Sequence, residues 1–376
     1  MKQYDIEDLV KVAKRDNNII RPYLYVNPIQ GKHIPCNPKD TIDLMKYMAG
    51  IIDSRYVGEK ILVVGFAETA TAIGAGVSMF SDCVKYCTQT TREDITDAQY
   101  MYFTESHSHA KEQSVVINNW NSVIFQMDRI LFVEDEVTTG NTICKLIRCI
   151  KDKFENWNGK YSIISILNSM TENQMKELSE QGIECLYVKK IPYEYEVNSV
   201  DAYSYHKCDC VTYIDANLLS LSSSINNLRV LQNVDLYVKS VDRYVRNIID
   251  SLEITEKYKT IDVVGTEEFM FPPLYLAYKL NQKYPYTEIR FHATTRSPIS
   301  VSNDVRYPLH NKYEISSLYE KGRKTYIYNL SKYDLGLICT DAEELNEKGL
   351  DELSMAVRNK GTEEIIFIGG ASTSEK

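Results

Sequence analysis

The sequence predicts an α/β fold in which a largely parallel sheet carries flanking helices. Three short apolar runs have the composition of buried strands, namely 61–66, 129–134 and 161–167. Helical periodicity falls between and before these runs, with apolar residues at the spacing of one helix face. One such stripe consists of Ile143, Leu146, Ile147 and Ile150, and another of Ile42, Met45, Ala49 and Ile52. This alternation of strands and helices is typical of an α/β protein.

Composition excludes several classes of protein. The chain has 376 residues, 44% hydrophobic and 25% charged, which is ordinary for a globular protein. A formal net charge of −9 argues against a non-specific nucleic-acid binder, which needs a basic footprint. The charged start lacks the apolar core of a secretory signal, and no apolar run approaches the ~20 residues that cross a bilayer. We therefore expect a cytoplasmic protein with neither nucleic acid nor membrane as partner.

Cysteine usage agrees with a reducing compartment. The nine cysteines show no CxxC spacing, so free thiols are expected. One local cluster, His206, Cys208 and Cys210, has alternating spacing that would place the three side chains on one side of a strand. Metal binding and a half-buried strand end are both open there, because no fourth ligand is evident.

An internal repeat predicts two related domains. The segment 62–70 is echoed at 262–270, and 87–94 is echoed at 292–299 with an offset of 204 between the two arginines. A third echo pairs 129–136 with 324–334. A helical stripe precedes each of the two Val-Val-Gly sequences, at 63–65 and at 263–265. The second stripe consists of Val241, Tyr244, Val245, Ile248 and Leu252. We therefore predict domains at 1–220 and 221–376, with a linker or loop in the Ser/Asn-rich stretch 219–227.

The segment ILFVEDEVTTGNT, 130–142, is the strongest functional signal. A strand ends in Glu134 and Asp135, and a turn then opens the amphipathic helix. The turn consists of Thr138, Thr139, Gly140, Asn141 and Thr142. Backbone N–H groups at a helix start and threonine hydroxyls bind phosphate, while paired carboxylates accept hydrogen bonds from neighbouring sugar hydroxyls. The pattern indicates a site for a phosphorylated sugar. The alternative interpretation is purely structural, namely an acidic strand end followed by a capped helix.

A second loop rich in small residues, GFAETATAIGAG at 65–76, runs from a strand into a helix. Small residues allow a ligand close to the backbone, although a simple strand–helix packing junction has the same composition. Glu68 could reach a magnesium ion or hold the loop. The chain contains neither GxxxxGK[ST] nor GxGxxG, which argues against a Walker loop and a dinucleotide fingerprint.

These motifs resemble those of the type I phosphoribosyltransferases. The 130–142 segment is similar to their signature for phosphoribosyl pyrophosphate (PRPP), except at Glu136, where the family usually has an aliphatic residue. The resemblance implies a type I phosphoribosyltransferase-like fold, PRPP binding, Mg²⁺ carried by PRPP as the cofactor, and transfer of phosphoribosyl to a base-like acceptor. It also implies that the 66–69 loop, Phe66, Ala67, Glu68 and Thr69, lies on the pyrophosphate, often with a strained peptide bond. Glu134, Asp135 and Arg92 are then the predicted catalytic residues.

In the orotate-type members of that family, the region before the signature strand is a mobile hood. Here this region is bracketed by TTRED at 90–94 and YFTESHSHAKEQ at 102–113. Arg92 suits a phosphate or pyrophosphate because its guanidinium is planar and permanently charged. Glu105, His107 and His109 alternate in the hood, where a ligand role and a solvated loop are both open.

The stretch TTRSP at 294–298 resembles the namesake motif of the TRSP domain, which follows orotate-type domains in proteins encoded beside bacterial tellurium-resistance and stress genes. The resemblance implies nucleotide-like metabolism, leaves a homodimer open, and does not identify the acceptor. Arg296 and Ser297, with Glu267 and Glu268, form either a ligand site or an ion-paired structural cluster. Because residues 331–334 lack an acidic pair, we expect no PRPP in this degenerate copy. A regulatory module that binds PRPP without turnover is the alternative to an enzyme, and a phosphorolytic direction would use the same site.

Overall fold

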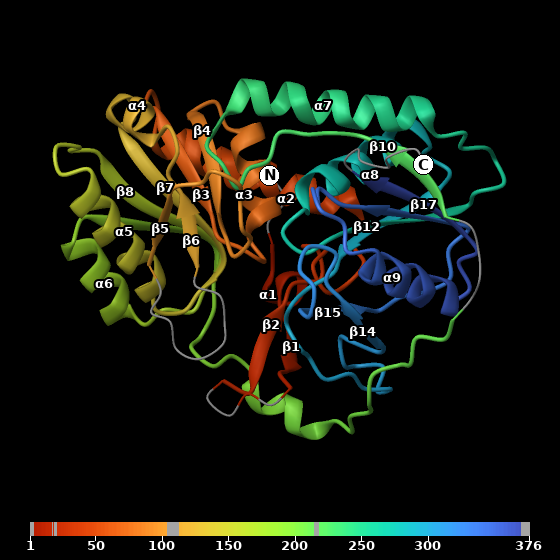
Figure 1. Cartoon of the computed structure of the whole chain (residues 1–376). Coiled ribbons are helices and arrows are strands. Elements are labelled where there is room, and N and C mark those ends of the chain that lie inside the picture. Colours follow the sequence, from red (N-terminus) through yellow and green to blue (C-terminus); the bar gives the residue numbers. More distant parts are fainter. Residues whose placement is uncertain (1–3, 17, 19–20, 104–112, 214–217, 370–376) are drawn as a thin grey trace. The chain divides into compact units, whose positions relative to one another are not determined.

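The computed structural model describes residues 4–16, 18, 21–103, 113–213 and 218–369 (Figure 1). It divides into two compact units. The N-terminal unit holds Tyr4, 43–195 and 226–240, and the C-terminal unit holds 5–42, 196–225 and the residues from 241 onward. The units thus differ from a contiguous division near residue 220, because two segments before that position belong to the C-terminal unit. The division falls inside α2 (Pro38–Arg55) and inside α7 (Val234–Ser251).

The N-terminal unit is built on a mainly parallel sheet with the order β5-β6-β4-β3-β7-β8-β9, and a short β11 pairs with β4. Its strands are β3 (Ile61–Gly65), β4 (Val84–Thr91), β5 (Tyr100–Tyr102), β6 (Ser114–Val116), β7 (Arg129–Val137), β8 (Lys160–Asn168), β9 (Ile183–Lys190) and β11 (Gln232–Asn233). Its helices besides α2 are α3 (Thr71–Phe80), α4 (Trp120–Val123), α5 (Asn141–Lys153) and α6 (Glu172–Glu180), with a 3-10 turn η1 (Ile124–Gln126). In Figure 1, α5 and α6 cover one face of this sheet.

The three predicted strands are confirmed as β3, β7 and β8, which pair in parallel. The predicted stripe on α5 is buried, as an amphipathic helix packed on a sheet requires. One boundary differs from the prediction, because β7 continues past its apolar run to Val137. Backbone pairing of Glu136 and Val137 with Leu167 and Asn168 on β8 extends the strand through the acidic residues.

The C-terminal unit has its own parallel sheet with the order β10-β17-β16-β12-β13 and two antiparallel hairpins, β1–β2 and β14–β15. Its strands are β1 (Lys11–Lys14), β2 (Tyr23–Val26), β10 (Leu219–Ser222), β12 (Thr260–Gly265), β13 (Glu288–Ala293), β14 (Lys312–Ser316), β15 (Lys324–Tyr328), β16 (Leu335–Cys339) and β17 (Glu364–Gly369). Its helices are α1 (Ile6–Leu9), α8 (Phe271–Lys283), α9 (Glu347–Asn359) and a 3-10 turn η2 (Val197–Ala202). The predicted fold class, two successive α/β sheets, is confirmed.

Two local predictions in this unit are wrong. The stretch 219–227 is not wholly a linker or loop, because Leu219–Ser222 forms the edge strand β10 beside β17. The segment 324–334 is not the counterpart of β7, because its strand β15 belongs to an antiparallel hairpin with β14. The predicted stripe on α7 and just beyond it is buried. Among the described residues no helix is long and apolar enough to cross a membrane.

Candidate active site

The two predicted ligand loops lie at the same edge of the N-terminal sheet. From β3 the chain crosses to β4 on one side, and β7 then pairs on the other side of β3. Ligands of open α/β sheets bind beyond the carboxyl ends of the strands at such a reversal. Gly65, at the end of β3, lies opposite Val133, and the Phe66 N–H donates to the Val133 carbonyl at 3.0 Å. The sheet therefore brings the 66–69 loop beside the acidic pair.

The 66–69 loop is held by side chains from neighbouring segments. The Ala67–Glu68 peptide bond is cis. The Ala67 N–H donates to Thr90 Oγ1 at 2.8 Å, and the Gln113 side-chain amide donates to the Ala67 carbonyl at 3.0 Å. No sequence pattern marks Thr90 or Gln113 as a partner of this loop, although Thr90 stands two residues before Arg92. The Phe66 side chain lies in the core against Phe103 and Phe132, so only its backbone can face a ligand.

The small residues also serve packing. A Cβ atom on Gly74 of α3 would lie 2.9 Å from the Gly65 Cα atom, so this strand–helix contact requires glycine. Hence the loop is a packing junction as well as a candidate ligand site, and the two interpretations are compatible.

The acidic pair contacts the loop directly. Thr69 Oγ1 donates to Asp135 Oδ1 at 2.8 Å, which joins the two motifs. Withdrawal from water, followed by the charges of Asp135 and Glu136, raises the pKa of the Glu134 carboxyl well above its usual range. Glu136, the residue that departs from the family pattern, accepts a hydrogen bond from Ser169 Oγ at 3.2 Å. The Glu136 carboxylate is thus stabilised by the residue that directly follows β8.

The turn after β7 has the geometry of an anion site. Gly140 is the N-cap of α5 in the left-handed region, with φ at +71°. Asn141 and Thr142, the first residues of α5, are exposed, while the Thr139 hydroxyl accepts a hydrogen bond from the Asn141 N–H at 3.3 Å. The backbone N–H groups at the start of this 13-residue helix can therefore face a phosphate. Thr138, half-buried, completes the predicted turn.

Other predicted residues divide into two groups. Arg92 follows β4 and is half-buried at the same sheet edge as the 66–69 loop. Glu105, His107 and His109 lie outside the described residues. Within the part of the chain that the structure describes, no three His, Cys, Asp or Glu side chains form a group able to hold a metal.

In the C-terminal unit, the structure shows the ion pairs that one interpretation of Arg296 requires. Arg296 Nε lies 2.9 Å from Glu267 Oε2, and Arg296 Nη2 lies 3.1 Å from Glu268 Oε1. The Ser297 carbonyl accepts a hydrogen bond from Tyr328. A ligand role for these residues stays a prediction.

The histidine–cysteine cluster does not form a regular strand. His206 makes an isolated antiparallel bridge with Val301, and the neighbouring Asp209 makes an isolated parallel bridge with Tyr313. Burial raises the pKa of the Cys208 thiol, whereas Cys210 is exposed. Burial therefore weakens the thiolate character that a metal ligand needs at Cys208.

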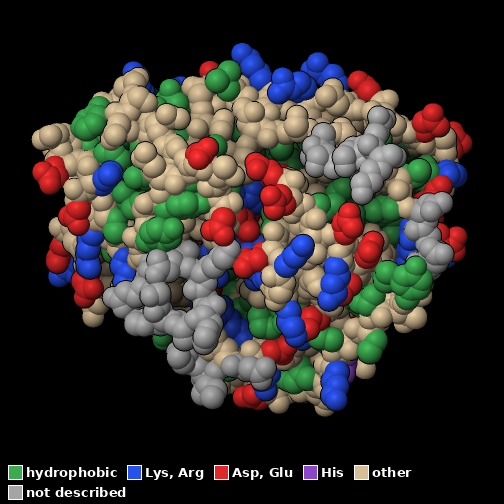
Figure 2. All heavy atoms as spheres, in the orientation of Figure 1, with side chains coloured by type: hydrophobic (Ala, Val, Ile, Leu, Met, Phe, Trp, Pro, Cys, Tyr) green, Lys and Arg blue, Asp and Glu red, His purple; other side chains and the backbone are tan. Residues whose placement is uncertain are grey.

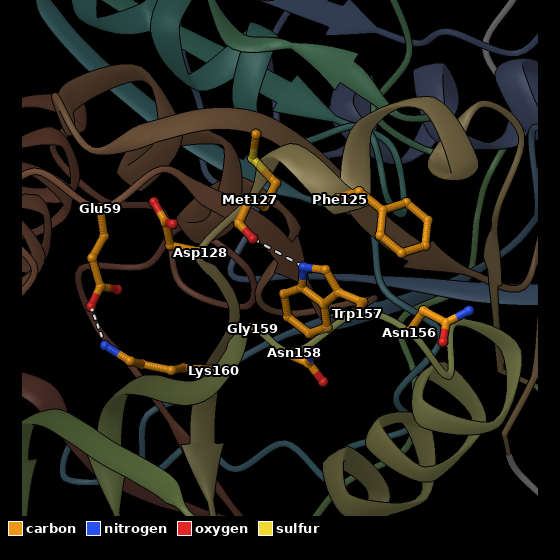
Figure 3. A pocket seen from close by; sticks show the side chains of 9 residues that line it. All are labelled: Glu59, Phe125, Met127, Asp128, Asn156, Trp157, Asn158, Gly159 and Lys160. Carbon is orange, nitrogen blue, oxygen red and sulfur yellow. Dashed lines mark hydrogen bonds and ion pairs between the residues drawn. The ribbon is translucent and has the colours of Figure 1, made fainter.

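A separate pocket of about 390 Å³ lies at the opposite edge of the N-terminal sheet, where β7 and β8 begin (Figure 3). The Trp157 indole donates to the Met127 carbonyl at 3.0 Å, and Lys160 Nζ lies 2.9 Å from Glu59 Oε1. These contacts tie the amino ends of the strands together.

On the face in Figure 2, acidic and basic side chains are interspersed.

Comparison with known families agrees with this geometry. Residues 9–190 match a family described as phosphoribosyl transferase, and residues 235–357 match the TRSP domain found C-terminal to it. Residues 9–190 therefore form a phosphoribosyltransferase domain. The TRSP domain follows it in this chain, at residues 235–357.

Solved structures show a weaker likeness. Adenine phosphoribosyltransferase from Trypanosoma brucei is 12% identical with a TM-score of 0.34, covering 48% of this chain and 76% of that one. The Rhodothermus marinus adenine enzyme is 12% identical with a TM-score of 0.34, covering 50% and 96%. A hypoxanthine phosphoribosyltransferase from Staphylococcus aureus is 18% identical with a TM-score of 0.27, covering 42% and 75%. A search of curated proteins found no match. These likenesses are too low for any inference about the acceptor.

Proposed function

We propose that the N-terminal unit transfers phosphoribosyl from PRPP to a nitrogen of a base-like acceptor and releases pyrophosphate. The observation that carries this proposal is the Thr69–Asp135 hydrogen bond of 2.8 Å. It unites a loop suited to pyrophosphate with an acidic pair and a turn suited to a phosphorylated ribose. PRPP is the small molecule with both groups on one sugar.

The residues divide the ligand between them. The N–H groups of the turn at Gly140 and the start of α5 would bind the 5′-phosphate, because they point out of the helix end. Asp135 and Glu134 would accept hydrogen bonds from the ribose hydroxyls. The raised pKa of Glu134 means that one carboxyl of the pair is readily protonated before the ligand binds. Ribose hydroxyls or a cation then favour its charged form.

Charge changes during transfer explain the remaining roles. As the bond to pyrophosphate breaks, negative charge grows on the leaving group and positive charge grows on the ribose ring. The backbone of the 66–69 loop and the fixed charge of Arg92 would stabilise the leaving group. The carboxylates of Glu134 and Asp135 would lie beside the positive ring. Exclusion of water from the site during transfer would prevent the hydrolysis of PRPP.

The donors fit magnesium that arrives with the substrate. Mg²⁺ commonly keeps several waters and takes one or two carboxylates plus substrate phosphates. Asp135, Glu134 and Glu68 supply such carboxylates near the loop, whereas the described residues include no cage of three protein ligands. When bound, the ion would neutralise charge on the leaving pyrophosphate.

We place the enzyme in the cytoplasm, in the synthesis or salvage of a nucleotide-like metabolite, as the TRSP resemblance to stress and tellurium-resistance proteins suggests.

The test is Asp135→Asn, which is nearly isosteric but removes charge from the acceptor. A hydrogen bond to a charged group contributes about 1.5–3 kcal/mol, so PRPP affinity should fall roughly tenfold to a hundredfold in calorimetry. Asp152→Asn is the matched control, because Asp152 is exposed in the last turns of α5, far from the N-terminal end of that helix. Equal PRPP affinity in the two variants would show that the motif is misassigned.

Turnover needs a separate measurement. The full chain is mixed with PRPP, Mg²⁺ and a panel of bases, and mass spectrometry then detects a PRPP-dependent gain of phosphoribosyl. Release of pyrophosphate with one base, and its loss in Asp135→Asn, is the expected result. Tight PRPP binding without turnover on any base would favour a regulatory module over an enzyme.

A further inference from the structure

The two units share one arrangement of strands around their candidate sites. In each, a central strand is followed by a helix and a second strand on one side, and a third strand then pairs on the other side. These strands are β3, β4 and β7 in the N-terminal unit and β12, β13 and β16 in the C-terminal unit. A helix and a fourth strand, β8 or β17, extend each sheet beyond the third. The reversal of strand order therefore falls at the same place in both sheets.

Strand register converts this likeness into residue correspondences. Gly65 lies opposite Gln89 and Val133, and Gly265 lies opposite Ala293 and Cys339. Counting three residues on from Gln89 and from Ala293 reaches the two arginines of the sequence repeat, 92 and 296. The helix that follows begins six residues after each glycine, at 71 and at 271.

One hydrogen bond is repeated in both loops. The Ala67 N–H donates to Thr90 Oγ1 at 2.8 Å, and the Glu267 N–H donates to Thr294 Oγ1 at 2.9 Å. Each donor stands two residues after the equivalent glycine, and each threonine stands two residues before the equivalent arginine. The 266–269 loop is therefore the structural counterpart of the 66–69 loop.

The chemistry of the two loops differs at this point. Where the first loop has Ala67, the second has Glu267, and Glu267 and Glu268 are 1% and 2% exposed. Glu267 Oε2 lies 2.9 Å from both Arg296 Nε and Arg323 Nη2. The fully buried Lys32 donates to the Glu267 carbonyl at 2.7 Å. Carboxylates of the chain thus occupy the place beside the arginines where a phosphate group would lie.

The sugar side of the counterpart is filled as well. Because Cys339 is the register equivalent of Val133, Thr340 and Asp341 stand where Glu134 and Asp135 stand in the first unit. Asp341 Oδ1 accepts a hydrogen bond from the Tyr319 hydroxyl at 2.7 Å. The Tyr319 hydroxyl thus donates to the Asp341 carboxylate, as a hydroxyl of a bound sugar would.

The tip of one hairpin supplies the side chains that contact Glu267 and Asp341. The β14–β15 hairpin comes between the second and third strands of its unit, as β5–β6 does in the N-terminal unit. Residues 317–323 at its tip contribute Tyr319 and Arg323, and also Ser317, whose hydroxyl donates to Glu267 Oε1 at 2.5 Å. The hairpin in the position of a hood is therefore hydrogen-bonded onto the site by its own side chains.

We infer that the C-terminal unit is a phosphoribosyltransferase-type fold whose ligand site is filled from within. Glu267 and Glu268 replace phosphate groups, Tyr319 replaces a sugar hydroxyl, and the β14–β15 tip holds the site closed. Such a site excludes PRPP, because a ligand would have to separate buried ion pairs. The identification of the counterpart with a PRPP site rests on the function proposed for the N-terminal unit, whereas the occupation by carboxylates does not.

The first experiment measures hydrogen exchange of the full chain with and without PRPP. We expect slower exchange in the 66–70 and 134–142 peptides and no change in the 266–269 and 294–297 peptides. Protection of 266–269 and 294–297 in the wild-type chain would overturn the inference. Absence of protection at 66–70 and 134–142 would instead overturn the function proposed for the N-terminal unit, and the two failures are therefore distinct.

The second experiment vacates the site. Glu267→Ala restores the residue of the first loop and leaves Arg296 paired with Glu268, so an anion can enter beside the arginines. With inorganic phosphate as the probe, exchange of 294–297 should slow about tenfold, the effect of one charge-assisted hydrogen bond. No protection at saturating phosphate in the folded variant would overturn the inference.

Two further variants complete the design. Glu267→Gln keeps the side-chain shape but removes its charge, so it frees the arginine charges without emptying the site. If Glu267→Ala does not fold, a smaller gain of phosphate protection is expected in Glu267→Gln. Glu320→Gln is the control, because Glu320 also pairs with Arg323 at 2.9 Å but is 36% exposed at the rim. It should gain no protection at 294–297. Equal gains in Glu320→Gln and Glu267→Gln would refute a site filled specifically by Glu267.

Discussion

The turn at Gly140 offers a sharp test of the phosphate site, through Gly140→Val. The glycine has a φ of +71°, and a Cβ atom there would lie 3.2 Å from Leu178 Cδ1. A left-handed conformation costs an ordinary residue about 1–2 kcal/mol, and valine is also β-branched. The side chain would also press against Leu178 and Met170 and so displace the turn whose N–H groups are expected to bind phosphate.

Strain and ligand binding predict separate effects on melting. The strain alone should lower the melting temperature by a few degrees, since about 1 kcal/mol shifts a domain of 150–250 residues by roughly 2–4 °C. PRPP at a hundredfold its Kd should stabilise the wild-type chain by about 2.7 kcal/mol. In Gly140→Val this PRPP-dependent shift should disappear while circular dichroism remains native.

Gly182→Val separates the two effects. Gly182 follows α6 with a φ of +74°, and a Cβ atom there would meet no heavy atom within 4 Å. It carries the same backbone strain without the same neighbours, so it should melt a few degrees lower yet keep the full PRPP shift. Scanning fluorimetry with and without PRPP compares the three proteins. A wild-type PRPP shift in Gly140→Val would refute the phosphate turn.

Two more variants test the electrostatics of the N-terminal unit. Arg129→Met breaks the pair between Arg129 Nε and Glu59 Oε2, 2.6 Å apart, and should cost about 3 kcal/mol in denaturant unfolding, at the low end for buried pairs because Glu59 keeps some exposure. Arg129 lowers the pKa of Glu59, so the pair contributes stability above about pH 4.5 that is lost as pH falls through the lowered pKa. The free energy of unfolding of the variant should therefore change less with pH below pH 4.5. A pH dependence equal to that of the wild type would contradict this prediction. Glu134→Gln should raise the melting temperature at pH 7 while weakening PRPP binding: a carboxyl with a raised pKa contributes stability below its ordinary pKa that is lost as pH rises through the raised value. A lower melting temperature at pH 7 in that variant would count against the raised pKa.

The parts of the fold that the sequence could predict are those with a local signal. The strands β3, β7 and β8 are continuous apolar runs because both faces of a parallel sheet are covered, and the stripe on α5 repeats every turn. The turn before α5 could be predicted because glycine is favoured at a left-handed N-cap such as Gly140, whereas the ligand role of 138–142 stays a prediction.

Long-range pairing decided what the sequence could not show. The length of β7 depends on its pairing with β8, and β10 becomes a strand because β17 offers an edge. The contiguous domain boundary also differs from the compact units, since 5–42 belongs to the C-terminal unit. None of these relations leaves a pattern within a single segment.

The repeat shows both the reach and the limit of sequence comparison. The echoes at offsets of 200 and 204 coincide with the register of β3, β4, β12 and β13. The third echo pairs 324–334 with 129–136 because TYIYNL is an apolar, β-rich run like ILFV. Sheet pairing instead makes β16 the counterpart of β7. An apolar run identifies a strand, but only its partners identify which strand it is.

This difference changes the comparison of the two sites. With β16 in place, Asp341 corresponds to Asp135, so the C-terminal unit keeps one carboxylate at the sugar position. Loss of the acidic pair is thus only partial, and it cannot by itself explain why this unit would exclude PRPP. The larger change is Glu267 in the position of Ala67, which brings a carboxylate to the arginines. In the inference above, fold topology thus sets where each site lies, and Glu267 together with the β14–β15 tip accounts for the occupation of the second site by the chain itself.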